Sequence, residues 1–120
     1  MVLNFDRYVE FVLANGDKKS LPWSDVNYFK SNGYLTELNY LDNDKPKKVS
    51  INKRIGQIEE ELHFKNFSIF RSHRSYLINI KNMMPYKNYP PNDLLFKGNV
   101  SAKLSRRKRL EFHKFFIQGF

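Results

Sequence analysis

Two groups of cationic and hydroxyl side chains are the strongest candidates for chemistry in this chain. The first is the polar centre of residues 70–79, where Arg71, His73, Arg74 and Ser75 lie between apolar stretches. An arginine guanidinium is a planar fork that grips guanine O6 and N7, or a phosphate, with two hydrogen bonds, and serine hydroxyls suit phosphate oxygens. By composition alone, this segment fits a polar loop with surface arginines as well as it fits a binding loop.

The second group is a run of cations at the predicted start of a C-terminal helix. It consists of Arg106, Arg107, Lys108 and Arg109, which follow the expected N-cap Ser105. Because a helix N-terminus already carries partial positive charge, cations there are unfavourable for the helix itself. A polyanion docking at this point would use both the cations and the unpaired N–H groups of the first turn. A basic surface run is common, but this position favours a functional site.

A polar turn between two predicted strands is a third and weaker candidate. It contains Lys30, Asn32, Gly33 and Tyr34 and carries one cation. Most turns of this composition only reverse the chain.

Catalytic and metal chemistry find little support in the sequence. There is no cysteine, and none of His63, His73 and His113 has a second ligand at metal-binding spacing. His73 and Ser75 lack an orienting acid nearby, in a strongly basic setting. We therefore expect no enzyme activity, no metal, no other cofactor and no small-molecule substrate.

Charge is distributed unevenly over the 120 residues, whose formal net charge is +9. Residues 1–44 carry a net charge of −3, whereas residues 45–96 and 97–120 each carry +6. This excess indicates a polyanionic partner, either a nucleic acid or an anionic membrane surface. The length predicts one domain over residues 1–120, and the lack of a signal-like start or a long apolar run predicts a cytoplasmic protein.

Alternating apolar residues and tight turns predict a mostly β fold. Strands are expected over residues 9–13, 18–21, 26–29, 34–40, 67–69, 76–80, 94–96 and 100–104. Residues 42–46 predict a polar turn that ends at Pro46.

Two helices are expected between and after these strands. Ile51, Ile55, Ile58 and Leu62 form one apolar stripe, which predicts a helix over residues 51–62 with Ser50 as its N-cap and Glu59–Glu61 as a solvated face. The second helix covers residues 105–118, and its expected apolar residues are Leu110, Phe112, Phe115, Phe116 and Ile117.

In this order, the segments resemble the LytTR domain, the DNA-binding output module of many bacterial response regulators. Residues 70–79, FRSHRSYLIN, are similar to the signature F-R-x-H-R-S-Y-L-V-N at every defined position except Ile78. Residues 21–26, 27–34, 51–62 and 103–107 resemble the family's other segments. Because no phospho-receiver domain is recognised in these 120 residues, we expect either an excised output module or a stand-alone regulator.

The resemblance implies an elongated, mostly β fold, with one central and one C-terminal helix, that reads duplex DNA in the major groove with loops. Three segments would reach the DNA: residues 32–34, 73–75 and 105–107. Arg74, Arg107 and one residue of the 32–34 turn are the expected base contacts. The expected phosphate-contacting or positioning residues are Lys30, His73, Ser75, Ser105, Arg106 and Lys108, and Arg71 belongs to the same site. The expected partners are promoter direct repeats and a second copy of the chain, without a membrane.

Two other classes of function remain open from the sequence. Residues 106–120 could act as a basic amphipathic helix on a membrane or on another protein. Exposed aromatic residues on the sheet could instead stack with single-stranded DNA or RNA.

Overall fold

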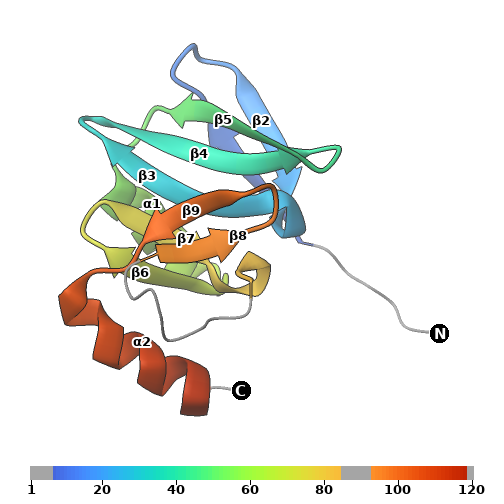
Figure 1. Cartoon of the computed structure of the whole chain (residues 1–120). Helices are drawn as coiled ribbons and strands as arrows, with labels where there is room; N and C mark the ends of the chain where they lie inside the picture. Colours follow the sequence, from blue (N-terminus) through green and yellow to red (C-terminus); the bar gives the residue numbers. More distant parts are fainter. Residues whose placement is uncertain (1–6, 85–92, 119–120) are drawn as a thin grey trace.

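A five-stranded antiparallel sheet forms the centre of the computed structural model, which describes residues 7–84 and 93–118 (Figure 1). The strand order is β5-β4-β3-β7-β6. The bounds are β3 Val26–Asn32, β4 Leu35–Asp42, β5 Lys45–Ile51, β6 Ile69–His73 and β7 Tyr76–Asn79. The mostly β prediction is therefore confirmed.

Both faces of this sheet are covered, because its central strands are apolar on both sides. Leu77 faces one core cluster, whereas Tyr76 and Ile78 face the other. The first face packs against the hairpin of β1 (Tyr8–Val12) and β2 (Lys18–Pro22) and against helix α1 (Ile55–Phe64). The second packs against the hairpin of β8 (Asp93–Phe96) and β9 (Val100–Lys103) and against helix α2 (Arg106–Gln118). In Figure 1, β8 and β9 lie in front of the sheet and α1 lies behind it.

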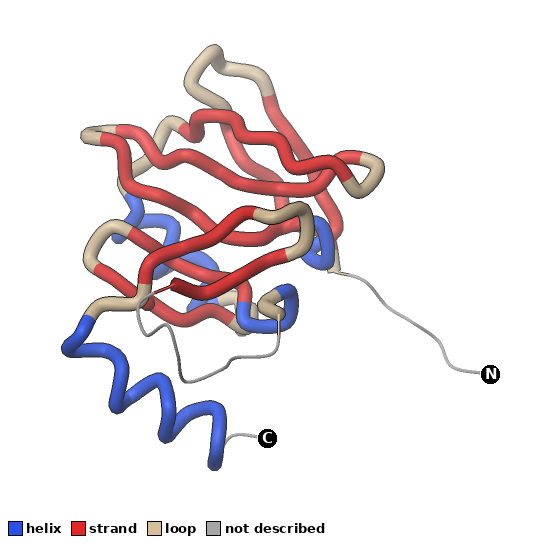
Figure 2. Tube along the Cα trace, viewed as in Figure 1, coloured by secondary structure: helices blue, strands red, loops and turns tan. Residues whose placement is uncertain are grey.

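Most connections between the strands are short turns, as the tan segments in Figure 2 show. Two single-turn 3-10 helices, η1 (Trp23–Asp25) and η2 (Ile80–Asn82), lie at the ends of strands. The β4–β5 turn uses Asn43 and Asp44, both with positive φ, at 51° and 64°. This is the geometry of a type I′ hairpin, which matches the twist of the strands that it joins.

The central helix begins later than the sequence predicted. Ser50 and Ile51 belong to β5, and α1 starts at Ile55, so the assignment of Ser50 as its N-cap is wrong. Ile51 is nevertheless buried in the same core cluster as Ile55. The last apolar residue of a strand can continue the apolar stripe of the helix that follows. Residue spacing alone therefore does not show whether such a residue belongs to the strand or to the helix.

The expected stop at Pro46 is also wrong, because β5 continues through this residue. Pro46 lies opposite Leu41 on a strand that has a sheet neighbour on one side only. An edge strand tolerates proline because one side of its backbone has no ladder to complete.

One expectation about helix surfaces holds and one is corrected. Glu60 and Glu61 are exposed and Glu59 is half-buried, as expected of a solvated face, and Glu59 and Glu61 also form ion pairs with Arg71 and Lys53. Leu110 is 68% exposed, whereas Phe112 is fully buried in the second core cluster. The side chains of Phe115, Phe116 and Ile117 lie outside the described part of the structure.

The buried side chain of Asn79 ties η1 and η2 to the end of β7. Its amide donates to the carbonyl oxygens of Trp23 (2.9 Å) and Val26 (2.8 Å), and its Oδ1 accepts from the backbone N–H of Lys81 (3.1 Å). Removing this side chain would delete these three hydrogen bonds and leave a space in the buried interior, although Asn82 still donates to the carbonyl oxygen of Val26 and the N–H of Val26 to that of Trp23.

We therefore expect Asn79→Ala to lower the free energy of unfolding by about 2–4 kcal/mol. Urea denaturation of the full chain measures this change. Asn52→Ala is the matched control, because Asn52 is exposed and its loss should change stability by less than about 0.5 kcal/mol. Equal effects of the two substitutions would contradict the role of Asn79.

Candidate nucleic-acid interface

Residues 70–79, the signature segment, form a hairpin whose turn, the signature turn, is tighter than the sequence predicted. β6 extends to His73 and β7 begins at Tyr76, so the turn itself consists of Arg74 and Ser75. Ser72, expected in a polar loop, is fully buried. Its hydroxyl donates to the carbonyl oxygen of Lys103 at 2.7 Å.

The guanidinium group of Arg71 stabilises this turn through hydrogen bonds. Its Nη1 donates to Glu59 Oε1 on α1 (2.6 Å), its Nε to the carbonyl oxygen of His73 (3.1 Å) and its Nη2 to that of Arg74 (2.6 Å). All three nitrogens of the guanidinium are thus engaged within the protein. This geometry suits Arg71 to holding the turn rather than to binding a ligand.

The imidazole of His73 stabilises the turn from within. Its Nδ1 accepts a hydrogen bond from the backbone N–H of Ser75 at 3.0 Å. Burial lowers the pKa of His73 from its ordinary value of 6.5, and the nearby charges of Arg74, Lys103 and Arg71 lower it further. The ring is therefore neutral at pH 7, and it keeps an Nε2–H donor for an external acceptor.

Three arginines in two of the segments remain available to a ligand. Arg74, Arg106 and Arg107 are exposed, and no hydrogen bond or ion pair among the described residues uses their guanidinium groups. Each retains the full planar fork that binds guanine or phosphate.

The β3–β4 turn lies beside the signature turn. The backbone N–H of Ser31 donates to the carbonyl oxygen of Ser75 at 2.8 Å. Gly33 has φ +64°, a conformation that L side chains rarely adopt, and its neighbours Asn32 and Tyr34 are exposed. Lys30 is exposed too, with its Nζ 5.9 Å from the ring centroid of Tyr76.

The start of α2 is fixed on the other side of the signature turn. The backbone N–H of Ser105 donates to the carbonyl oxygen of Ser72 at 2.8 Å. The hydroxyl of Ser105 accepts from the backbone N–H of Lys108 at 3.2 Å, which confirms Ser105 as the N-cap. The ammonium group of Lys108 forms an ion pair with Glu111 at 3.4 Å.

A hollow opens where the signature turn meets this helix start. It is lined by His73, Asp93, Lys103, Leu104, Ser105 and Arg106. Its rim carries more positive than negative groups, which suits the oxygen atoms of an anion better than a cation.

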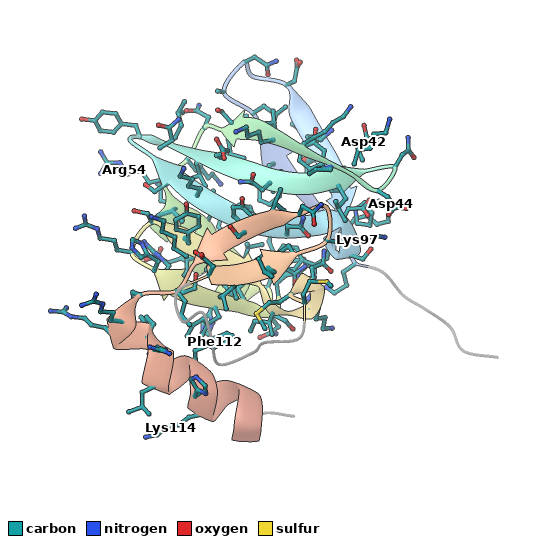
Figure 3. The ribbon with its side chains drawn as sticks, viewed as in Figure 1. Asp42, Asp44, Arg54, Lys97, Phe112 and Lys114 are labelled. Carbon is teal, nitrogen blue, oxygen red and sulfur yellow. The ribbon has the colours of Figure 1, made fainter. Side chains whose placement is uncertain are left out.

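The three predicted segments, residues 32–34, 73–75 and 105–107, therefore lie along one edge of the molecule, which we call the basic edge. In Figure 1, the β3–β4 turn, the β6–β7 turn and the start of α2 follow one another down the left side. Asp42 and Asp44 lie toward the other end of the sheet, as Figure 3 shows, where they pair with Lys47 and Lys97. The protein thus separates an edge rich in cations from an end that contains paired acids.

Two cations of this edge were missed in the sequence. Lys103 lines the hollow, and Arg54 precedes α1 on the same side of the molecule (Figure 3). A correct helix start would have revealed Arg54, because it would then stand at a helix N-terminus, as the α2 cations do.

Other kinds of site are not seen in the parts of the chain that the structure describes. No three histidine, aspartate or glutamate side chains gather there in a way that could hold a metal ion. Separately, no helix within residues 7–84 and 93–118 has the length and apolar character needed to cross a membrane.

Comparison with known proteins gives one family and a similar fold. The family model of the LytTr DNA-binding domain matches residues 17–117. A solved LytTr DNA-binding domain, from a putative methyl-accepting/DNA response regulator of Bacillus cereus, superposes with a TM-score of 0.67 at 18% identity. The match covers 98% of this chain and 100% of that one. No curated protein sequence matches the chain.

The hydrogen bond between Ser75 and His73 predicts a pH-dependent turn. Protonation of Nδ1 would bring two donors together and break the bond. Because the pKa of His73 is lowered in the folded chain, the unfolded chain takes up this proton first as the pH falls. His73 should therefore reduce the free energy of unfolding progressively below about pH 6.5.

Imidazole ¹⁵N shifts of His73 across a pH titration measure the expected state directly. His73→Asn is the matched variant, because its Oδ1 can still accept from Ser75 but does not titrate, so this part of the pH dependence should disappear. A ring that is protonated on Nδ1 at pH 7 would contradict the assignment.

Proposed function

The chain belongs to the LytTR family of DNA-binding domains, and from that premise we propose that it reads a specific duplex DNA sequence with the three segments of its basic edge. The segments enter the major groove as turns rather than as a recognition helix. In this role the chain is the output domain of a transcriptional regulator.

The proposal rests on the backbone hydrogen bonds that connect the three segments of the edge. Ser31 bonds to Ser75, and Ser105 bonds to Ser72, so each outer segment is fixed to the signature hairpin through its backbone. A rigid set of turns fixes where each side chain leaves the backbone, which favours a constant alignment with the bases. Surface arginines on unconnected loops would give only salt-dependent attraction.

We assign different roles to the residues of this edge. Arg74 and Arg107 are assigned to base edges; like that of Arg106, their guanidinium groups are exposed and unpaired among the described residues. The residues assigned to phosphates are Lys30, Ser75, Arg106, Lys108 and His73, the last through its Nε2–H. Ser105 caps α2 and Arg71 braces the turn, so both act as positioning residues. A residue of the Asn32-Gly33-Tyr34 turn remains the third base contact.

We further propose a place for this domain in signalling. The Bacillus cereus neighbour is described as part of a response regulator, and the same output role is proposed here, in the cytoplasm. Two copies on promoter direct repeats would extend the short contact surface of one edge. Together they would read a longer site than a single copy can.

The structure weakens one of the two rival classes of function. Stacking of single-stranded nucleic acid on the sheet needs exposed aromatic rings, but Tyr28, Phe29 and Tyr76 are buried beneath the covering layers. The membrane or protein-interaction alternative relies on α2, where Leu110 is exposed. Co-sedimentation with anionic vesicles, combined with a failure to retard duplex DNA, would favour that alternative.

Selection of bound duplexes from a random pool tests the proposal. We expect a pair of spaced direct repeats to be enriched. For the selected duplex, neutralising four to six phosphates predicts that log K falls with log salt at a slope of about −4 to −5. The absence of an enriched motif, or a slope near zero, would overturn the proposed function.

Arg74→Ala should weaken binding to the selected duplex by about 1–3 kcal/mol and relax discrimination at one base pair. Lys45→Ala is the control, because Lys45 is an exposed cation next to the β4–β5 turn, away from the edge. Binding to a set of single-base variants of the duplex measures both effects. Equal weakening for every variant would make Arg74 a phosphate contact only.

A further inference from the structure

The loop between β5 and α1 adds a fourth element to the basic edge. Arg54 is the last residue before α1 and is exposed. Its guanidinium carbon lies 4.7 Å from the ring centroid of Tyr34 in the β3–β4 turn. Arg54 is thus joined to one of the three segments already described, although twenty positions separate the two residues.

This contact orients Arg54 without using its donors. A guanidinium that lies over an aromatic ring is held through its face, while its N–H groups in the plane stay available. No hydrogen bond or ion pair among the described residues uses the Arg54 side chain. Arg71 is the opposite case, since its three nitrogens all bind protein acceptors.

The backbone beneath Arg54 is fixed on both sides. The fully buried hydroxyl of Thr36 donates to the carbonyl oxygen of Lys53 at 2.7 Å. The backbone N–H of Arg54 itself donates to Gln57 Oε1 at 3.1 Å. Arg54 therefore projects from an anchored helix start and not from a long loop.

The charge of Arg54 is placed unfavourably for the fold. It adds a cation to the partly positive N-terminus of α1, just as Arg106 does for α2. Both helices begin on the same side of the molecule in Figure 1. A bound anion would offset the unfavourable charge at either helix start.

Tyr34 is 76% exposed at the tip of the β3–β4 turn. The guanidinium group of Arg54 lies over its ring. A stacking platform for a guanidinium is a use for such a ring that does not require contact with a base.

We propose that Arg54, held by Tyr34, binds a backbone phosphate that flanks the bases read by Arg74. This inference rests on the proposed function and adds a contact from the β5–α1 loop. Tyr34 then acts as a positioning residue for Arg54.

The test compares Arg54→Ala with Lys45→Ala on the selected duplex and on a scrambled duplex. A lost phosphate contact lowers the magnitude of the salt slope by about 1. We expect Arg54→Ala to show this change and to weaken both duplexes about fivefold at moderate salt, whereas Lys45→Ala changes neither measurement. Phosphate ethylation interference should lose one flanking position in Arg54→Ala.

A double-mutant cycle tests the role of Tyr34. Tyr34→Leu should weaken binding about threefold in the wild-type background, as expected for loss of an exposed cation–π contact, and should have no further effect in Arg54→Ala. Thermal unfolding checks that each variant is folded. Additive losses would instead make Tyr34 a direct DNA contact and overturn its positioning role.

The two proposals fail in different ways. If the wild-type chain selects a duplex but Arg54→Ala behaves like Lys45→Ala, the fourth contact is wrong and the proposed function stands. If the wild-type chain selects no duplex, the proposed function fails, and this inference fails with it.

Discussion

The buried hydroxyl of Ser72 is the contact on which the geometry of the basic edge depends. β6 has only one neighbour in the central sheet, so nothing in the sheet itself fixes the other side of this strand. Ser72 supplies that connection, because its hydroxyl donates to the carbonyl oxygen of Lys103 and its backbone carbonyl oxygen accepts from the N–H of Ser105. These two bonds join a signature strand to a helix start more than thirty residues away. The arginines that follow Ser105 are thereby placed beside Arg74.

Charge on this edge is arranged at some expense to stability. Arg54 and Arg106 stand at helix starts, where a cation is unfavourable. Burial lowers the pKa of His73, and three nearby cations lower it further. The apolar layers on both sides of the sheet offset this repulsion, for example through Phe112, which packs with Phe70 at a ring distance of 5.5 Å. An edge kept positive in this way attracts a polyanion along its whole length. Local conflicts with helix stability of this kind are typical of functional sites.

Much of the site could be predicted from the sequence, because the signature, the cations after Ser105 and the polar turns are local features. The missing parts depend on contacts between distant residues. The bracing role of Arg71 depends on Glu59, whose direction follows only from the true start of α1. Arg54 was missed for the same reason, since an apolar stripe that includes Ile51 fits a strand and a helix equally well. Ser72 looked like a loop residue, because nothing in its neighbours shows that it meets β9.

The central claim is that the edge binds duplex DNA as one rigid surface. Titration of the ¹⁵N-labelled chain with a selected duplex, followed through backbone amide shifts, tests it most directly. Residues 32–34, 73–75 and 105–108 should shift together with one apparent affinity, while Asn43 and Asp44 in the β4–β5 turn stay unchanged. Shifts confined to residues 109–118 of α2, or different affinities for the three segments, would contradict the claim.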